Sequence, residues 1–218
     1  MAAPLASIEA WVFDLDNTLY STPLLYDAVG ARMTAYIARA LAINDAEAMV
    51  LRERYFDDYG ATVVGLSRHH AMDAHDFLAH VHDVDYSVLD PDPELGALIE
   101  QLPGRKIVFT NGGGGHGQRA LAQLAIAHCF ELVFDIEAAG LAPKPQRAAY
   151  ERLVAACGID PARSVLIEDS ARNLEPARAL GFATVLIGGN SASQADHTAP
   201  DAKAFLRSVL STLGGEAR

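Results

Sequence analysis

Residues 8–18 read Ile-Glu-Ala-Trp-Val-Phe-Asp-Leu-Asp-Asn-Thr, and this stretch decides the fold. The run from Ile8 to Leu15 is short, apolar and rich in aromatic and branched side chains, which predicts a buried strand that ends in carboxylates. Similar runs recur later in the chain, with segments of helical periodicity between them. The further predicted strands are 106–110, 132–134, 164–167 and 183–187, and the predicted helices are 117–127, 146–157 and 171–180.

This alternation of strand and helix predicts an α/β fold with a Rossmann-like, doubly wound parallel sheet. Parallel neighbours need a crossover connection, and the helices supply it. In such sheets a ligand lies beyond the carboxyl ends of the strands. The segments expected there are Asp14–Thr18, Thr110–Gly117 and Glu168–Ser170.

The alternation fails between residues 21 and 92, where the pattern is helical throughout. The predicted helices there are 24–41, 45–59 and 73–82, and no strand is evident. Pro23 near one border and Pro91 with Pro93 at the other fit an insertion that leaves the core and returns before the next helix. We therefore predict a catalytic core of residues 1–20 and 93–218 and a helical cap of residues 21–92.

The composition limits the possible partners and the compartment. Among 218 residues, 17 Lys and Arg stand against 28 Asp and Glu, so the net charge of −11 disfavours nucleic acid. The two cysteines, Cys129 and Cys157, are expected to be buried free thiols in a reducing cytoplasm. No apolar run reaches membrane-spanning length, and residues 1–10 do not resemble a signal peptide, so we expect a cytoplasmic protein that does not bind membranes. Monomer and homodimer both remain open.

Two pairs of acidic residues follow two of the predicted strands. Asp14 and Asp16 are two residues apart and point to one side of an extended strand end. Mg²⁺ would explain two such close like charges, although an Asx-rich turn is an alternative. Glu168 and Asp169 form a second pair after another strand. Together they predict a four-carboxylate pocket, which Mg²⁺, a phosphate and a lysine would neutralise.

Two further segments suit a phosphate group. Thr110 and Asn111 precede four glycines, 112–115, whose backbone N–H groups and the Thr110 hydroxyl can surround a phosphate at the start of a helix. A flexible loop is the alternative reading of those glycines. Lys144 lies between Pro143 and Pro145, which restrict the backbone and make the position of its ammonium more predictable. A solvated lysine in a turn is the alternative there.

These four segments together resemble the motifs of the haloacid dehalogenase-like hydrolase superfamily. The resemblance implies that Asp14 is the nucleophile that forms an aspartyl-phosphate and also binds Mg²⁺. It implies that Asp16 is the general acid and base, with its backbone carbonyl on the metal. Thr110 and Lys144 would hold the phosphoryl oxygens. The remaining implied metal ligands are Asp169, directly, and Glu168, directly or through water.

Two stretches, 12–20 and 59–66, are similar to the pyrimidine 5′-nucleotidase-type branch of that superfamily, and the stretch 77–82 adds to the similarity. This similarity implies a Mg²⁺-dependent phosphomonoesterase for a small phosphorylated metabolite, namely a nucleoside 5′-monophosphate. The expected substrate contacts are Thr18 and Asn111 in the core and Tyr59, Arg68 and His69 in the cap. Relatives often carry larger residues where this chain has 112–115, so we expect a mobile loop there.

Other functions are weighed on the same residues. A dehalogenase has no use for a second carboxylate such as Asp16, and nothing in the sequence requires a phosphomutase. A phosphatase for a sugar phosphate or phosphoglycolate remains open, as does a non-catalytic protein that binds a phosphorylated ligand. Five histidines lie within residues 69–82, but their spacing does not suit a metal, so solvated surface positions are expected. They are His69, His70, His75, His80 and His82.

Overall fold

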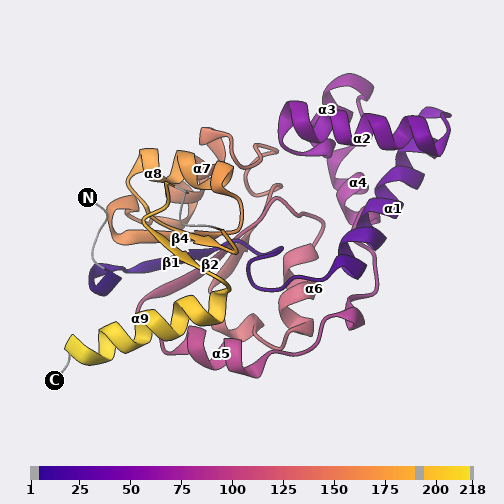
Figure 1. The fold of residues 1–218 in the computed structure, drawn as a ribbon. Helices are drawn as coiled ribbons and strands as arrows, with labels where there is room; N and C mark the ends of the chain where they lie inside the picture. The colour runs from indigo at the N-terminus through magenta and orange to yellow at the C-terminus, as the bar shows by residue number, and fades with distance from the viewer. Residues whose placement is uncertain (1–4, 190–193, 217–218) are drawn as a thin grey trace.

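A computed structural model describes residues 5–189 and 194–216 of the chain (Figure 1). Its six-stranded sheet has the order β3-β2-β1-β4-β5-β6, and every neighbouring pair is parallel. The strands are β1 (Ala10–Phe13), β2 (Arg105–Phe109), β3 (Leu132–Phe134), β4 (Ser164–Glu168), β5 (Ala183–Ile187) and β6 (His197–Ala199). This architecture confirms the predicted Rossmann-like α/β class.

Strand β1 lies in the middle of the sheet, and this position places the first acidic pair. Phe13 is in register with Val108 of β2 and with Ile167 of β4. The backbone N–H of the next residue, Asp14, donates to the carbonyl of Ile167 at 2.8 Å. The four residues of β1 are buried on both faces, as expected for a strand that is covered by helices on both sides.

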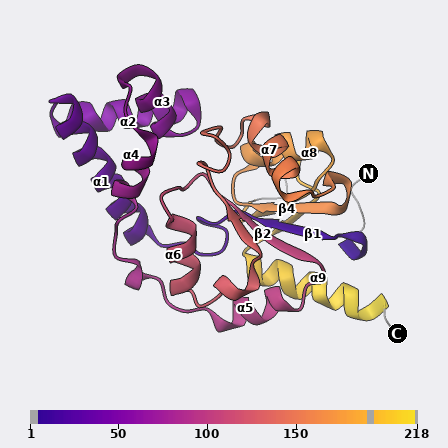
Figure 2. The same ribbon diagram turned by 180° about the vertical axis from the view of Figure 1, so that it is seen from behind.

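Helices cover both faces of the sheet (Figures 1 and 2). One face carries α7 (Arg147–Cys157) and α8 (Ala171–Leu180), and the other carries α5 (Pro93–Glu100), α6 (His116–Gln123) and α9 (Ala202–Glu216). Four short 3₁₀ helices complete the described core: η1 (Leu5–Ser7), η2 (Tyr86–Val88), η3 (Ala127–Cys129) and η4 (Pro161–Arg163).

Four helices between β1 and β2 form an insertion beyond one end of the sheet, beside α6 (Figures 1 and 2). They are α1 (Pro23–Leu41), α2 (Asp45–Tyr59), α3 (Thr62–His70) and α4 (Ala74–Val81). The insertion has a hydrophobic core of its own, in which Ile37, Leu66 and Phe77 are fully buried. We refer to α1–α4 as the insertion; the predicted limits of the cap, 21–92, remain a prediction.

Helix α3, strand β6 and helix α9 are among the elements that were not predicted from the sequence. Helix α3 was missed because its residues 62–66 are all buried and show no amphipathic period. The short edge strand β6 and the helix α9 lie in the part of the chain after 188, where the sequence is small and polar at first. Residues 190–193 of that stretch lie outside the described residues. The predicted helix 117–127 ends earlier, at Gln123, and Ala125 has a positive φ of 60°.

No helix within the described residues is both long and apolar enough to span a membrane. The two cysteines are free and buried, as predicted.

Candidate active site

The carboxyl ends of the central strands bring the predicted residues together. Asp14 follows β1, Thr110 follows β2, and Glu168 is the last residue of β4. Lys144 reaches the same place from the loop between β3 and α7. Because β1 lies between β2 and β4, these side chains lie around the end of β1.

Lys144 is the centre of a buried ionic cluster. Its Nζ donates to Asp14 Oδ1 at 2.5 Å, to Glu168 Oε2 at 2.8 Å and to the Phe109 carbonyl at 2.9 Å. The exposed fractions are 6% for Asp14, 2% for Lys144 and 1% for Glu168. The alternative of a solvated lysine in a turn is therefore wrong, because this ammonium is fully enclosed and hydrogen-bonded.

The cluster has more negative than positive charge. Burial and the nearby Glu168 carboxylate raise the pKa of Asp14 to about 7, against the opposing effect of Lys144. Burial likewise raises the pKa of Glu168 above its ordinary value. The two carboxylates raise the pKa of Lys144, although burial alone would lower it. Lys144 therefore stays charged, and one further positive charge would let both acids ionise fully.

A bound cation would supply that further positive charge, and Asp14, Glu168 and Asp169 offer ligands for it. Each offers a carboxylate oxygen, and these atoms lie within 4.8 Å of one another. Hard oxygen ligands with this spacing suit Mg²⁺. The Asp16 side chain is not in this group, so only its backbone carbonyl, as the resemblance implies, is a candidate ligand.

Glu168 is held more tightly than Asp169. Its Oε2 accepts from Lys144, and its Oε1 accepts from the backbone N–H of Ser170 at 3.2 Å. Asp169 is more exposed than Glu168. These contacts favour Asp169 as the direct ligand. Ser170 is the N-cap of α8 by position, but its side chain makes no cap hydrogen bond.

The Thr110–Asn111 segment builds the wall opposite Glu168. Thr110 is buried, and its Oγ1 accepts from the N–H of Gly112 at 2.9 Å, which leaves the hydroxyl proton to be donated. Asn111 exchanges two hydrogen bonds with the backbone of Lys144, from Nδ2 to the carbonyl at 3.0 Å and from the Lys144 N–H to Oδ1 at 2.8 Å. Asn111 thus holds the lysine loop in place.

Thr18 stands out among the predicted substrate contacts. It is 4% exposed, and its Oγ1 is buried without a hydrogen-bond partner among the described residues. An unpaired buried hydroxyl costs roughly 1–3 kcal/mol, so such a group is a candidate to bind an incoming oxygen atom.

Asp16 does not point toward the lysine. Its Oδ1 lies 3.0 Å from Nε2 of His116 and accepts from the Tyr20 hydroxyl at 2.5 Å. Burial would raise the pKa of Asp16, but His116 and Tyr20 hold it below its ordinary value. Sequence reasoning missed His116, which begins α6 just after the four glycines. The sequence signal that could have marked His116 is its position at the start of a helix, directly after the glycines 112–115.

The glycine loop contacts the insertion directly. Gly114 has φ of 58°, and a Cβ there would lie 2.6 Å from backbone atoms of Leu78 and Ala79 in α4. The N–H of Gly114 donates to Glu137 Oε2 at 2.6 Å, and the other oxygen of Glu137 pairs with His75 of α4 at 2.8 Å. These close contacts argue against the mobility predicted for the loop.

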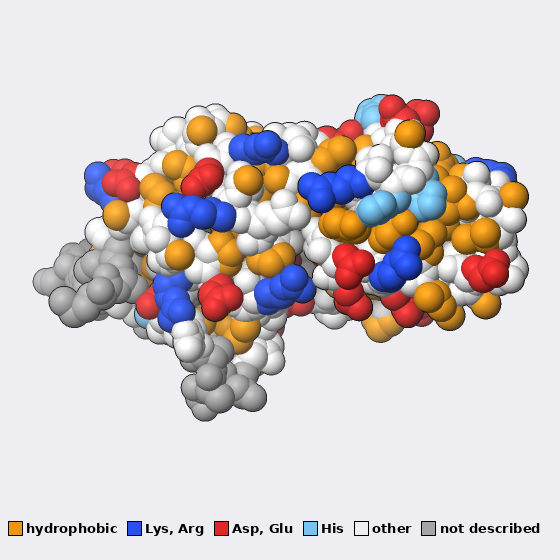
Figure 3. Space-filling model, turned by 90° about the horizontal axis from the view of Figure 1, so that it is seen from above, with side chains coloured by type: hydrophobic (Ala, Val, Ile, Leu, Met, Phe, Trp, Pro, Cys, Tyr) orange, Lys and Arg blue, Asp and Glu red, His pale blue; other side chains and the backbone are white. Residues whose placement is uncertain are grey.

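A cavity of about 690 Å³ lies between the core and the insertion, beside the contact of the glycine loop with α4. From the core it is lined by Asp16, Asn111, Gly112 and His116, and from α1 and α2 by Tyr26, Arg52, Glu53, Phe56 and Asp57, among others. Tyr26 and Phe56 are 59% and 57% exposed, which is unusual for aromatic side chains. Seen from above, with the core on the left, acidic and basic side chains are interspersed over this face of the molecule (Figure 3).

The predicted cap residues lie elsewhere. Tyr59, Arg68 and His69 are not among the residues that line the cavity. The Tyr59 hydroxyl is 2.5 Å from Nε2 of His69, and the Arg68 guanidinium lies 5.4 Å from the centre of the Tyr59 ring. The unpredicted helix α3 causes this, because it carries Arg68 and His69 in its last turn, against the end of α2. Their contact with substrate stays a prediction.

The clustered histidines do not share one environment. His75 is exposed, whereas His82 is 5% exposed and stacks on His116 with 4.7 Å between ring centres. The expectation of a solvated surface position was therefore wrong for His82. Its ring packs against His116 at the cavity, and burial lowers its pKa to about 4, so it is neutral near pH 7.

The fold and this cluster define a Rossmann-like α/β protein that carries carboxylates and a buried lysine at the carboxyl ends of its central strands. The chain belongs to the haloacid dehalogenase-like hydrolases, since the profile of that family matches residues 8–181.

A curated relative has a name that refers to phosphate metabolism. The chain is 27% identical over 198 residues to "Phosphate metabolism protein 8" of Saccharomyces cerevisiae, an alignment that covers 82% of this chain and 61% of that protein. The chain thus spans less than two thirds of the length of this curated relative.

Solved structures share the fold. A "HAD phosphatase from Thermococcus onnurineus" has a TM-score of 0.61 and 20% identity, with 95% of this chain and 99% of that chain covered. The L-2-haloacid dehalogenase from Xanthobacter autotrophicus also has a TM-score of 0.61, with 17% identity and coverage of 93% and 98%. Both reaction types therefore occur on this fold, so the residues of the site must decide between them.

Proposed function

We propose that the protein is a Mg²⁺-dependent phosphomonoesterase that acts through an aspartyl-phosphate. The observation that carries this proposal is the strand-end cluster in which Lys144 pairs with Asp14 and Glu168, while Asp16 stands two residues away toward the cavity. A phosphate monoester brings negative charge that needs both a cation and a lysine. The cluster provides the lysine and the oxygen ligands for the cation.

Asp14 is the proposed nucleophile. One of its oxygens, Oδ1, is held by Lys144, so the carboxylate has a fixed orientation. Bound Mg²⁺ would neutralise the acidic pocket and the phosphoryl oxygens. Lys144 and the Thr110 hydroxyl supply further donors where negative charge develops. The other oxygen of Asp14 then attacks phosphorus, and the bond to the leaving oxygen breaks.

Asp16 is the proposed general acid and base. It lines the cavity, so it can reach the leaving oxygen of an ester that occupies the space below the insertion. The negative charge of a bound phosphate would oppose the lowering of the Asp16 pKa by His116 and Tyr20 and so favour a protonated Asp16 in the complex. That proton goes to the leaving alkoxide, and the resulting carboxylate then takes a proton from the water that attacks the aspartyl-phosphate. This second carboxylate favours phosphate chemistry over the dehalogenation that structural neighbours perform, because a halide leaves without a proton.

A nucleoside 5′-monophosphate is the substrate that the cavity supports best. Its volume lies within the roughly 300–1,000 Å³ of small-molecule sites. The exposed rings of Tyr26 and Phe56 offer faces on which a base can stack. Arg52 and Asp57 supply a donor and an acceptor for the polar edge of a pyrimidine. A sugar phosphate or phosphoglycolate would leave these aromatic faces unused.

Phosphate release from a panel of esters tests the proposal. With Mg²⁺, we expect UMP and CMP to be hydrolysed with higher kcat/KM than purine nucleotides, sugar phosphates or phosphoglycolate. Preference for a sugar phosphate would retain the phosphatase and reject the nucleotidase. Binding of phosphate esters without any turnover would instead support a non-catalytic phospho-ligand-binding protein, and release of halide from a 2-haloacid would support a dehalogenase.

A further inference from the structure

His116 makes contacts that the four motifs do not explain. Its side chain is 4% exposed, although it lies at the wall of an open cavity. Nε2 lies 3.0 Å from Oδ1 and 3.3 Å from Oδ2 of Asp16. The two residues are a hundred positions apart in sequence, so the fold has to bring them together.

The ring of His116 is fixed on its other sides. Its Nδ1 lies 2.8 Å from the Tyr86 hydroxyl, and its face stacks on His82. Tyr20 adds a second hydrogen bond to the same Asp16 oxygen and lies 3.3 Å from Nε2. The ring therefore cannot turn without breaking several contacts, and its orientation determines that of the Asp16 carboxylate.

We propose that His116 is a positioning residue, which holds the Asp16 carboxylate at the cavity wall in the orientation for proton transfer to the leaving group. This inference rests on the proposed phosphatase function. Without His116, only the Tyr20 hydroxyl would hold the Asp16 carboxylate at the cavity wall, and a misplacement of about 1 Å can cost roughly 100-fold in rate. The effect should appear only where a proton has to be transferred.

Two esters of similar size separate this role from a merely structural one. Benzyl phosphate releases an alkoxide that needs a proton, whereas p-nitrophenyl phosphate releases a stable phenolate that does not. For both, kcat/KM reports steps up to departure of the leaving group. For His116→Phe, which keeps a stacking ring but no donor, we expect kcat/KM to fall about 100-fold with benzyl phosphate and less than about 5-fold with p-nitrophenyl phosphate.

A second variant guards against misfolding. His116→Gln places an amide N–H near the position of Nε2, so it should recover kcat/KM for benzyl phosphate to within about 10-fold of the wild type. Equal losses with both esters, or no recovery in His116→Gln with normal thermal unfolding, would overturn the positioning role. A wild-type chain that hydrolyses neither ester would overturn the proposed phosphatase function itself.

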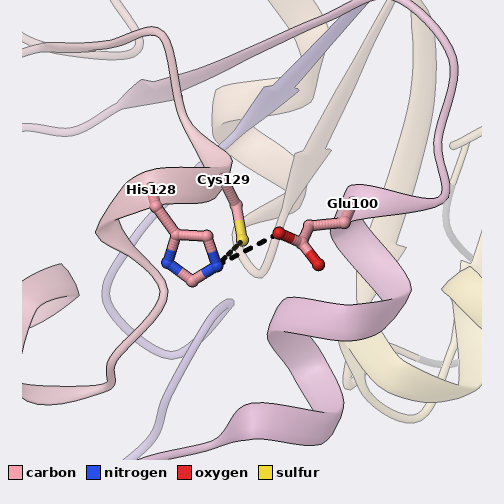
Figure 4. Close-up of side chains that lie close together, drawn as sticks. All are labelled: Glu100, His128 and Cys129. Carbon is pink, nitrogen blue, oxygen red and sulfur yellow. Dashed lines mark hydrogen bonds and ion pairs between the residues drawn. The ribbon is translucent and has the colours of Figure 1, made fainter.

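A separate group of side chains lies at the other end of the sheet (Figure 4). Glu100 ends α5, while His128 and Cys129 belong to η3, and both elements directly precede strands. The His128 Nε2 lies 3.2 Å from Glu100 Oε1 and 3.6 Å from Cys129 Sγ. All three ligand atoms lie within 4.8 Å of one another.

We infer that these three residues form a zinc site that is independent of the catalytic cluster. With Zn–S of about 2.3 Å and Zn–N of about 2.05 Å, a tetrahedral ion would separate sulfur from nitrogen by about 3.5 Å and nitrogen from oxygen by about 3.4 Å. The observed sulfur–nitrogen distance of 3.6 Å and nitrogen–oxygen distance of 3.2 Å agree with these two separations. Glu100 and His128 side chains are 57% and 61% exposed, which gives an ion access, while Cys129 is buried beneath them. Binding would release the thiol proton to water.

Cobalt tests this site by its spectrum. Full-length protein freed of metal by chelation is titrated with CoCl₂, and the near-ultraviolet band of thiolate bound to cobalt is recorded. The carboxylate cluster also takes Co²⁺ but has no thiolate, so it gives no such band. We expect the band in the wild type and in Cys157→Ser, and its loss in Cys129→Ser and His128→Ala. Its absence from the wild type, or its loss in Cys157→Ser, would overturn the site.

Discussion

The two walls of the cavity differ in how their polar groups are held. On the core side, Asp16 lines the cavity, and the neighbouring Asp14, Lys144 and Glu168 are buried and bonded to one another. We call this lining and the adjoining buried cluster the core wall. On the insertion wall, Tyr26 and Phe56 are more than half exposed. The core wall is preorganised for one kind of chemistry, whereas the insertion wall presents faces that a ligand has still to cover. The proposed function thus assigns the reaction type to the core and the substrate preference to the insertion.

The largest expected effect comes from a substitution of the proposed nucleophile in the core wall. Asp14→Asn keeps the shape of the side chain but not its negative charge, so we expect turnover of any phosphate ester to fall by at least about 1,000-fold. The midpoint temperature of unfolding should be unchanged or raised, because one of two buried like charges is gone. Phosphate release measures the first and calorimetry the second. The exposed control Asp58→Asn should keep full activity; turnover near the wild-type rate in Asp14→Asn would exclude this nucleophile.

Replacement of Lys144 should lower the stability of the protein, because Lys144 neutralises the buried cluster. Lys144→Met leaves Asp14 and Glu168 buried without their cation, which costs about 3–5 kcal/mol in the free energy of unfolding. Urea denaturation of metal-free protein at mildly alkaline pH measures this loss. Lys106→Met, at the start of β2, is the control and should change stability by about 0.5 kcal/mol or less. A comparably small loss for Lys144→Met would mean that the ion pairs add little to stability.

Mg²⁺ should stabilise the core wall through Asp169. At a concentration of about 100 times its Kd, the ion should raise the free energy of unfolding by about 2.7 kcal/mol. Thermal melting with Mg²⁺ and with EDTA checks this shift. We expect Asp169→Asn to lose most of it and the exposed control Asp90→Asn to keep it. An equal shift in both variants would place the ion elsewhere.

A substitution on the insertion wall should raise the KM for a nucleotide and leave the chemical step unchanged. Phe56→Ala removes an aromatic face, so the KM for UMP should rise about 10-fold while kcat/KM for p-nitrophenyl phosphate stays within about 2-fold. Val50→Ala, on the same helix but not among the residues that line the cavity, should leave both values unchanged. Steady-state kinetics with both esters decides this, and an equal change with both would deny the insertion a role in selection.

The contrast also explains how far the sequence could lead. Asp14, Thr110 and Glu168 could be placed together because each follows an apolar run, and parallel strands end at one edge of a sheet. The cavity residues of α2 could not be found, because which face of a helix looks toward another domain is a tertiary property. Helix α3 was hidden by continuous burial of residues 62–66. His116 was missed because its partners Asp16 and Tyr86 lie far away in the chain.

The contact between Gly114 and α4 restricts how this protein can change its substrate over evolution. A Cβ at this position would meet the backbone of Leu78 and Ala79, which cannot move aside as the end of a side chain could. Gly113 is crowded as well, by Leu78 and Ile136. Gly114 therefore accepts no side chain without displacement of the insertion, whereas the side-chain neighbours of Gly113 can shift. New specificities should arise by substitutions on α1 and α2, and directed libraries that include Gly114 would lose most of their members at that position.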